Sequence, residues 1–226
     1  KQEQGFLKLK VEYMDIVSFT KEIYMSFYEY ALKHSVNYKF EHMEEKLNLW
    51  FDPVQLQKVI FNLLSNAFKY TKAKGSITVS IRKIKNEVEI RVEDDGVGIS
   101  KESIHKIFDR FYQVDGQSSE FTLGTGIGLA VSKGIVELHK GNIRVESEVG
   151  QGSVFIVTLL TGNEHFPKEV LSDSESNFHL IKDGVLEDLA LEELMLEEPA
   201  KEQELTNEEK AGEMDIESKD SDNKPS

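Results

Sequence analysis

The stretch Val92-Glu93-Asp94-Asp95-Gly96-Val97-Gly98-Ile99 marks the end of a strand, followed by two acids and two glycines. The residues before it alternate between apolar and polar side chains, as a half-buried strand requires. Because glycine has no Cβ atom, the backbone after this strand can approach a flat ring closely. A fixed Asp94 carboxylate can accept a hydrogen bond from the amine of adenine, whereas the carbonyl of guanine has no proton to donate.

Two other interpretations of this stretch stay open. An ordinary Asp-Gly turn would use the same residues for backbone geometry alone. A receiver domain also ends its strands in paired acids that bind Mg²⁺. That fold is built from alternating strand and helix units, which the rest of the sequence does not match.

Patterns on both sides of this stretch predict the fold class. Alternating apolar residues predict strands over residues 7–12, 36–40, 47–51, 77–81, 88–92, 142–147 and 152–160. Apolar residues at three-to-four spacing predict helices over residues 18–33, 53–67 and 127–139, the second one beginning with the capping pair Asp52-Pro53. We expect the strands over 36–40 and 47–51 to flank a polar hairpin. Antiparallel strands with helices between them predict an α+β fold, a two-layer α/β sandwich whose helices cover one face of a mixed sheet.

Charge and composition exclude several functions. The 226 residues include 41 Asp/Glu and 27 Lys/Arg; residues 163–226 hold 20 acids and six bases, so residues 1–162 hold 21 of each. A neutral body with an acidic tail argues against nucleic acid as a partner, because phosphate binding rests on clustered Lys and Arg. The absence of cysteine excludes disulfides, thiol catalysis and Cys-ligated metals. With no apolar run of 18 residues and no signal-peptide pattern, we expect no membrane contact by this chain.

The predicted second helix carries Asn62-Leu63-Leu64-Ser65-Asn66-Ala67-Phe68-Lys69-Tyr70. Asn62 and Asn66 are four residues apart and share one helix face, with Lys69 and Tyr70 a turn further on. Asparagine is a mediocre helix former, so two on one face favour a ligand-binding role. An amide oxygen is a suitable donor for Mg²⁺. An exposed polar pair is the alternative interpretation.

Two later stretches complete the set of candidates. The aromatic residues in Ile107-Phe108-Asp109-Arg110-Phe111-Tyr112-Gln113-Val114 favour core packing, and Arg110 is a candidate phosphate contact. The stretch Gly124-Thr125-Gly126-Ile127-Gly128-Leu129 leads directly into a helix, whose first amides and dipole favour phosphate. A dinucleotide-binding fold would need a strand just before these glycines. The polar segment 115–123 precedes them instead, and we expect it to form a mobile lid.

Taken in order, these four stretches resemble the N, G1, F and G2 boxes of the catalytic and ATP-binding domain of sensor histidine kinases. That domain belongs to a superfamily shared with gyrase and certain chaperone ATPases. The resemblance covers about residues 7–160 and implies a mixed sheet of about five main strands backed by three helices, with ATP held between the helices and a lid. It implies ATP and Mg²⁺ as cofactors. It also implies a cytoplasmic location, as the cytoplasmic part of a membrane-anchored sensor.

The resemblance assigns a role to each matched residue. Asn66 would hold Mg²⁺ with Asn62 beside it, while Lys69 and Arg110 would act on the phosphates; Asn62, Lys69 and Arg110 form the catalytic set. Around the base, Tyr70 would flank the adenine, Asp94 would bond its amine, and Gly96, Gly98 and Ile99 would lie beneath it. Gly124, Thr125, Gly126, Gly128 and Leu129 would bind the phosphates and hinge the lid.

The sequence departs from that family at three points, one of which is the acidic tail, a segment that such domains do not need. Many relatives carry arginine where Gln113 stands. A phosphoacceptor histidine is followed at once by a carboxylate, and none of the six histidines here has one: His34, His42, His105, His139, His165 and His179. We therefore expect the acceptor histidine on a separate dimerisation hairpin absent from this chain, and the chain itself to be a monomer.

The expected domain organisation follows from the same resemblance. Residues 1–6 would end an upstream helical linker, residues 7–162 would form the kinase domain, and residues 163–226 would form an acidic, partly disordered linker. Residues 182–198 carry Leu186, Leu189, Leu194 and Leu196 among acidic residues, which allows a short amphipathic helix within that linker. The polar end at 223–226 is typical of a linker cut before a further domain, so we expect a receiver to follow, as in a hybrid kinase.

The expected activity is transfer of the γ-phosphoryl group of ATP to that histidine in two-component signal transduction. Hydrolytic relatives place a glutamate where Asn62 stands, and an amide has no basicity with which to activate water. A superfamily ATPase and a non-catalytic nucleotide-binding module of a degenerate kinase are the alternatives.

Overall fold

The computed structural model describes residues 8–113 and 126–172. The chain divides into two units, Lys1–Leu194 and Met195–Ser226, and every described residue belongs to the first. The expected upstream linker, the expected lid over 115–123 and the expected helix near 182–198 lie outside the described residues.

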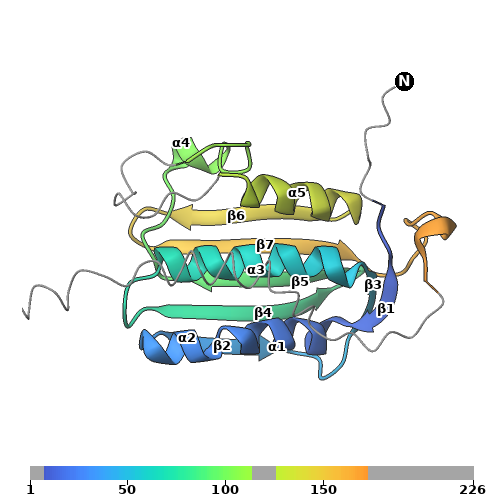
Figure 1. Cartoon of the computed structure of the whole chain (residues 1–226), viewed down its shortest axis with the longest axis horizontal. Helices are drawn as coiled ribbons and strands as arrows, with labels where there is room; N and C mark the ends of the chain where they lie inside the picture. Colours follow the sequence, from blue (N-terminus) through green and yellow to red (C-terminus); the bar gives the residue numbers. More distant parts are fainter. Residues whose placement is uncertain (1–7, 114–125, 173–226) are drawn as a thin grey trace, which may run out of the picture. The chain divides into compact units, whose positions relative to one another are not determined.

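A five-stranded mixed sheet forms the centre of the described chain (Figure 1). In spatial order its strands are β2 (Asn37–His42), β4 (Ser76–Ile84), β5 (Glu87–Asp94), β7 (Gly152–Leu160) and β6 (Asn142–Glu148). The β2–β4 pair is parallel and the other three pairs are antiparallel. The α+β class predicted from the sequence and the sheet of about five main strands implied by the resemblance are therefore confirmed.

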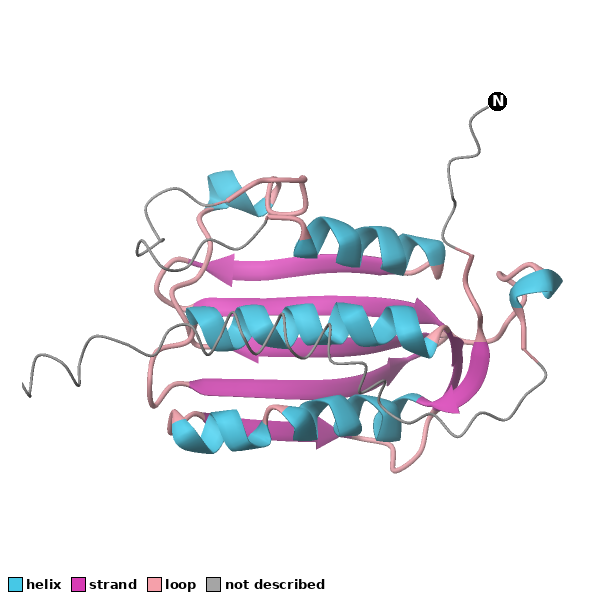
Figure 2. Ribbon diagram, viewed as in Figure 1, coloured by secondary structure: helices cyan, strands magenta, loops and turns pink. Residues whose placement is uncertain are grey.

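Helices cover one face of this sheet (Figure 2). They are α1 (Ile16–Ser26), α2 (Tyr28–Lys33), α3 (Pro53–Tyr70) and α5 (Gly128–Leu138), while the short α4 (Lys101–Ile104) and the 3₁₀ turn η1 (Lys168–Val170) lie beside them. Beneath the helices, Val79, Val92 and Val157 are buried. The opposite face carries a polar set in which Glu89 pairs with Arg91 and Arg144.

Helix α3 begins and packs as its sequence predicts. The Asp52 side chain accepts a hydrogen bond from the Gln55 N–H at 3.0 Å, and Pro53 occupies the first helical position. The apolar stripe predicted for this helix is buried: Leu56, Val59, Ile60, Leu63, Leu64 and Ala67. Each fully buried leucine contributes about 1.5–3 kcal/mol relative to an exposed one, so this helix holds the functional residues at its other end on a rigid base.

The N-terminal strand was predicted in the wrong place. The strand β1 spans Glu12–Asp15, not residues 7–12, and pairs antiparallel with β3 (Asn48–Phe51). The Asp15 side chain then accepts hydrogen bonds from the N–H groups of Val17 and Ser18, so helix α1 begins at Ile16 rather than at residue 18.

Two further predictions about this region are wrong. The single helix expected over residues 18–33 is two helices that meet at Phe27, a fully buried ring that stacks on Phe68. The strands near 36–40 and 47–51 do not form a hairpin, because β2 pairs with β4 and β3 pairs with β1. Packing between distant segments decided both outcomes.

The described chain remains packed beyond Gly162. Phe166 is buried, and its ring meets that of His139 edge-on at 6.2 Å between centroids. The Val11 N–H donates to the carbonyl of Val170 at 2.7 Å, and the Ser172 N–H donates to the carbonyl of Val11 at 2.8 Å. The segment after β7 is thus bonded to the segment that precedes β1.

Candidate functional site

Asp94 ends β5 as a buried carboxyl group. It pairs with Ser153 of β7 and is 6% exposed, so it lies almost out of contact with water. Burial raises the pKa of Asp94 to about 6, although a hydrogen bond from the Gly96 N–H at 2.9 Å to its Oδ1 acts in the opposite direction. A main-chain hydrogen bond from Ser153 acts in the same direction as that from Gly96, and a carboxylate with two donors keeps lone pairs that can accept a further hydrogen bond.

The glycines after Asp94 allow close backbone contacts on both sides of the turn. A Cβ atom at Gly96 would overlap the carbonyl oxygen of Tyr70, and the next residue, Val97, donates its N–H to that same oxygen at 3.3 Å. Gly98 has φ +70°, and a Cβ atom there would overlap the carbonyl oxygen of Glu148. The turn is therefore held between the end of α3 and the β6–β7 connection.

The next residue, Ile99, is fixed from the same side. Its N–H donates to Ser147 Oγ at 2.8 Å, and the Gly150 N–H donates to the carbonyl of Val97 at 2.8 Å. The stretch from Asp94 to Ile99 thus has its main chain bonded to α3, β6 and the β6–β7 turn. An Asp-Gly turn accounts for the bond between the Gly96 N–H and Asp94 Oδ1, and the burial of the carboxyl group is a feature additional to that turn.

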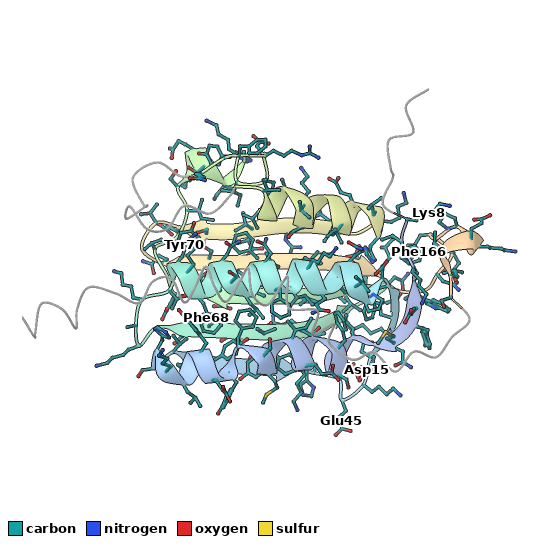
Figure 3. All side chains as sticks on the ribbon, viewed as in Figure 1. Lys8, Asp15, Glu45, Phe68, Tyr70 and Phe166 are labelled. Atoms are coloured by element: carbon teal, nitrogen blue, oxygen red, sulfur yellow. The ribbon has the colours of Figure 1, made fainter. Side chains whose placement is uncertain are left out.

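The last two turns of α3 bring a second group of predicted residues to this edge. Tyr70 is 41% exposed at the end of the helix, whereas Phe68 points back toward α2 and packs in the core (Figure 3). Asn66 and Lys69 are half-buried. Because the Tyr70 carbonyl accepts from Val97, this end of α3 and the turn after Asp94 lie side by side.

The two asparagines of α3 differ in their contacts. Asn62 donates its Nδ2 to Ser132 Oγ of α5 at 3.1 Å, and a Cβ atom at Gly128 would overlap its Oδ1. The Asn66 side chain, in contrast, makes no hydrogen bond with any described residue. Asn66 is therefore the amide that a ligand can engage, while Asn62 is occupied by the neighbouring helix.

Helix α5 begins at Gly128 with its first amides uncapped. The preceding residue, Ile127, makes no side-chain capping bond, and no acidic residue stands in the first turn. Gly126 has φ +66°, and its carbonyl accepts from the Phe111 N–H at 2.8 Å. Leu129 packs partly buried against the core. Gly124 and Thr125 lie outside the described residues.

The aromatic stretch before the glycines divides into core and surface. Phe108 and Tyr112 pack against the core, and the Tyr112 hydroxyl donates to Ser103 Oγ at 3.1 Å. Phe111 is 73% exposed and has φ +65°, so core packing was a wrong expectation for that ring. Arg110, beside it, is exposed.

Sequence reasoning missed the residues that join α3 to α5. These are Ser132, which accepts from Asn62, and His139, whose Nε2 accepts from the Asp52 N–H at 2.9 Å while its Nδ1 donates to the Ile135 carbonyl at 2.8 Å. The only local signal was a serine and a histidine within an apolar helix. The partners lie too far away in sequence for any spacing rule to pair them.

The residues present fit a nucleotide with its metal. In the ranges 8–113 and 126–172, no group of three or more His, Asp or Glu side chains could hold a metal by itself. An Asn66 amide oxygen combined with phosphate oxygens is a donor set that Mg²⁺ accepts.

Within the described residues, no helix is long and apolar enough to cross a membrane.

Comparison with known families decides what this arrangement is. Residues 51–163, half of the chain, match the family model described as histidine kinase-, DNA gyrase B- and HSP90-like ATPase. The chain belongs to this ATPase family. Its branch is that of the histidine kinases, since the relatives and the solved structures below carry that name, and the resemblance predicted from the four stretches is confirmed.

The kinase relatives are longer than this chain. The chain is 40% identical over 177 residues to histidine kinase P4 of Formosa agariphila, an alignment that covers 76% of the chain and 13% of the relative. It is 39% identical over 127 residues to sensor protein kinase WalK of Staphylococcus aureus, covering 55% of the chain and 29% of that protein. The chain therefore spans less than a third of these curated kinases.

A solved kinase domain has the same fold. The catalytic domain of histidine kinase ThkA superposes with a TM-score of 0.61 at 27% identity, covering 68% of this chain and 99% of that domain. The sheet and helices described here therefore correspond to a complete kinase catalytic domain. In this histidine kinase-type domain, the Asp94 turn lies against the end of α3, and the first turn of α5 lies against Asn62 of the same helix.

Proposed function

We propose that the chain binds Mg-ATP and transfers the γ-phosphoryl group to a histidine on a separate hairpin, in two-component signal transduction. The observation that carries this proposal is the buried Asp94 carboxyl group at the end of β5, whose turn is bonded to the end of α3, the helix that carries Asn66. A buried acid, a glycine-bounded turn and an uncapped helix start are three separate features that a nucleotide would use together.

In this proposal the Asp94 turn recognises the base. The carboxylate accepts a hydrogen bond from the adenine amine, and Gly96, Gly98 and Ile99 present main chain to the ring face. Tyr70, exposed at the end of α3, flanks the ring from the other side. Guanine would place a carbonyl against a buried carboxylate, so the site is selective for adenine.

The phosphates would meet the ends of α3 and α5. The amides of Gly126, Gly128 and Leu129, at and just before the start of α5, would favour negative charge through the helix dipole and the N–H groups that have no partner within the helix; Gly124 and Thr125 would extend this set. Asn66 would hold Mg²⁺, and Lys69 and Arg110 would neutralise further charge. When bound, the metal would supply charge neutralisation, which together with positioning is what phosphoryl transfer requires.

Kinase activity is favoured over rapid hydrolysis by the contacts of Asn62. An amide cannot take a proton from water, and this amide is already bonded to Ser132. A histidine acceptor is itself a nucleophile, so the ATP domain needs no base of its own. We expect slow hydrolysis by the chain alone.

The partners proposed for this domain are those that a histidine kinase requires. ThkA has been solved in complex with the response regulator TrrA, and we propose an analogous pathway here: a phosphoacceptor hairpin in the parent protein, a receiver domain after the acidic linker, and a membrane-anchored sensor with this domain on its cytoplasmic side. Residues 1–6 would end the linker from that hairpin, and the isolated chain would be a monomer.

Transfer in trans tests the proposal. The chain is mixed with a histidine-bearing hairpin of the parent protein and radiolabelled Mg-ATP, and label on the hairpin is measured. We expect an acid-labile phosphohistidine, and no label when Asp94→Asn replaces the unsubstituted chain. Nucleotide binding without any label on an intact hairpin would favour the non-catalytic module, and fast phosphate release by the chain alone would favour the ATPase.

A further inference from the structure

Ser132 lies in α5, four residues after Gly128, and is 1% exposed. Its Oγ accepts the Nδ2–H of Asn62 at 3.1 Å, across the contact between α5 and α3. A buried hydroxyl that accepts a hydrogen bond from the side chain of another helix is a candidate for fixing the relative position of the two helices.

Gly128 brings the start of α5 against the same amide. A Cβ atom at this position would overlap Asn62 Oδ1 and lie 2.9 Å from its Cγ. Residues 128 and 132 are one helical turn apart and share a face. Both ends of the Asn62 amide thus face α5: its Oδ1 lies against Gly128, and its Nδ2 donates to the Ser132 hydroxyl.

This contact lies one turn from the proposed metal ligand. Asn62 and Asn66 are four residues apart on one face of α3, and Asn66 makes no hydrogen bond with a described residue. The other end of α5 is attached separately, where His139 Nε2 accepts from the Asp52 N–H at 2.9 Å. The Asn62–Ser132 bond is therefore the attachment nearer the phosphate-binding end of the helix.

We infer that Ser132 is a positioning residue for the metal and phosphate part of the site. Its hydroxyl orients the Asn62 amide, which holds the first turn of α5 in a fixed position relative to Asn66, the residue that would hold Mg²⁺. This inference rests on the proposed function. It places the effect of Ser132 on ligands that carry Mg²⁺ and a triphosphate, and not on recognition of the base, which Asp94 performs on β5.

The test compares nucleotide affinities of the whole 226-residue chain with those of its Ser132→Ala variant. Calorimetric titration with a non-hydrolysable ATP analogue, with and without Mg²⁺, gives the factor by which the metal strengthens binding; adenosine reports on the base alone. A single hydrogen bond contributes about 0.5–1.5 kcal/mol, so we expect that factor to fall about 3–10-fold in Ser132→Ala. The affinity for adenosine stays the same.

Three variants separate positioning from general destabilisation. Ser80→Ala removes another buried serine, which is 6% exposed on the helix-free face of the sheet. It leaves unchanged the factor by which Mg²⁺ strengthens nucleotide binding, here called the metal factor. Ser132→Thr keeps a hydroxyl and restores most of the factor, and also provides a second variant if the alanine variant fails to fold. In an Asn62→Ala background, Ser132→Ala has no further effect, because the bond is already lost.

The outcomes distinguish this inference from the proposed function. If the unsubstituted chain binds no adenine nucleotide, the proposed function and this inference both fail. If it binds Mg-ATP analogue and Ser132→Ala shows the same metal factor, only the inference fails. Equal weakening of adenosine and Mg-ATP analogue binding would also overturn it, because that pattern describes a loss of packing and not of position.

Discussion

The two halves of the site are built in different ways. The half proposed to bind adenine, from Asp94 to Ile99, has its carboxyl group buried and its main chain bonded to α3, β6 and the β6–β7 turn. The half proposed to bind phosphate uses half-buried side chains, Asn66 and Lys69, and the uncapped first turn of α5. The proposed base selectivity thus lies where the chain is most constrained, and the proposed phosphate contacts come from half-buried side chains and a helix start.

This difference carries an electrostatic cost in the constrained half. The fold raises the pKa of Asp94 to about 6, so above that pH it holds an ionised carboxylate away from water. In the proposed function, a nucleotide amine would add a further hydrogen bond to this carboxylate. The phosphate half has no such buried charge among the described residues, so its response to substitution is expected to be smaller and to depend on the metal.

The largest effect should come from the turn that holds the adenine half. Gly98→Ala places a Cβ atom onto the Glu148 carbonyl in a left-handed backbone, and we expect it to lower the free energy of unfolding by about 3 kcal/mol or more. The matched control is Gly150→Ala, which has φ +80° but no atom within 4 Å of the added Cβ. It should cost about 1 kcal/mol in urea unfolding. Equal effects would show that the close contact at Gly98 is unimportant.

Removing the buried charge should weaken binding and stabilise the empty domain. Asp94→Asn loses a charged acceptor, so affinity for an ATP analogue should fall about 10–100-fold. At pH 8 the same variant should have a free energy of unfolding about 1–3 kcal/mol higher, and so a higher urea midpoint. The reason is that an acid with a raised pKa destabilises the folded state once it is ionised. Calorimetry and urea unfolding measure the two effects. A loss of both stability and binding would contradict the claim that the ionised, buried carboxylate destabilises the empty domain.

Binding should also depend on pH through the same group. Because the pKa of Asp94 is about 6, the carboxylate is mostly ionised at pH 7.5 and mostly protonated at pH 5. Affinity for adenosine, which has no phosphate to titrate, should fall about 10-fold over this range. In Asp94→Asn the weak residual binding should not follow this titration. A pH dependence that persists in the variant would assign it to another group.

A smaller and more selective effect is expected in the phosphate half. Asn66→Ala removes the proposed metal ligand and should reduce the strengthening of ATP-analogue binding by Mg²⁺ about 3–10-fold. Adenosine affinity should stay the same, and so should stability, because Asn66 makes no hydrogen bond with described residues. If adenosine binding falls as well, the two halves are not independent.

Local patterns predicted the parts of the molecule that depend on nearby residues. Helix α3 could be predicted from the capping pair Asp52-Pro53 and the apolar stripe that follows it. The Asp94 turn could be predicted from the acids and glycines at the end of β5. The β2–β4 pairing and the Asn62–Ser132 bond could not be predicted, since each joins residues far apart in sequence. The raised pKa of Asp94 depends on burial, which the motif does not encode.

Adenine selectivity tests the central claim most directly. The 226-residue chain is titrated calorimetrically with a non-hydrolysable ATP analogue and with its GTP counterpart, each with and without Mg²⁺. The account predicts binding of the adenine analogue that Mg²⁺ strengthens, and binding of the guanine analogue weaker by at least about 10-fold, since a carbonyl would face the Asp94 carboxylate. Equal affinity for both, or no binding to either, would contradict the assignment of Asp94 as the group that recognises the base.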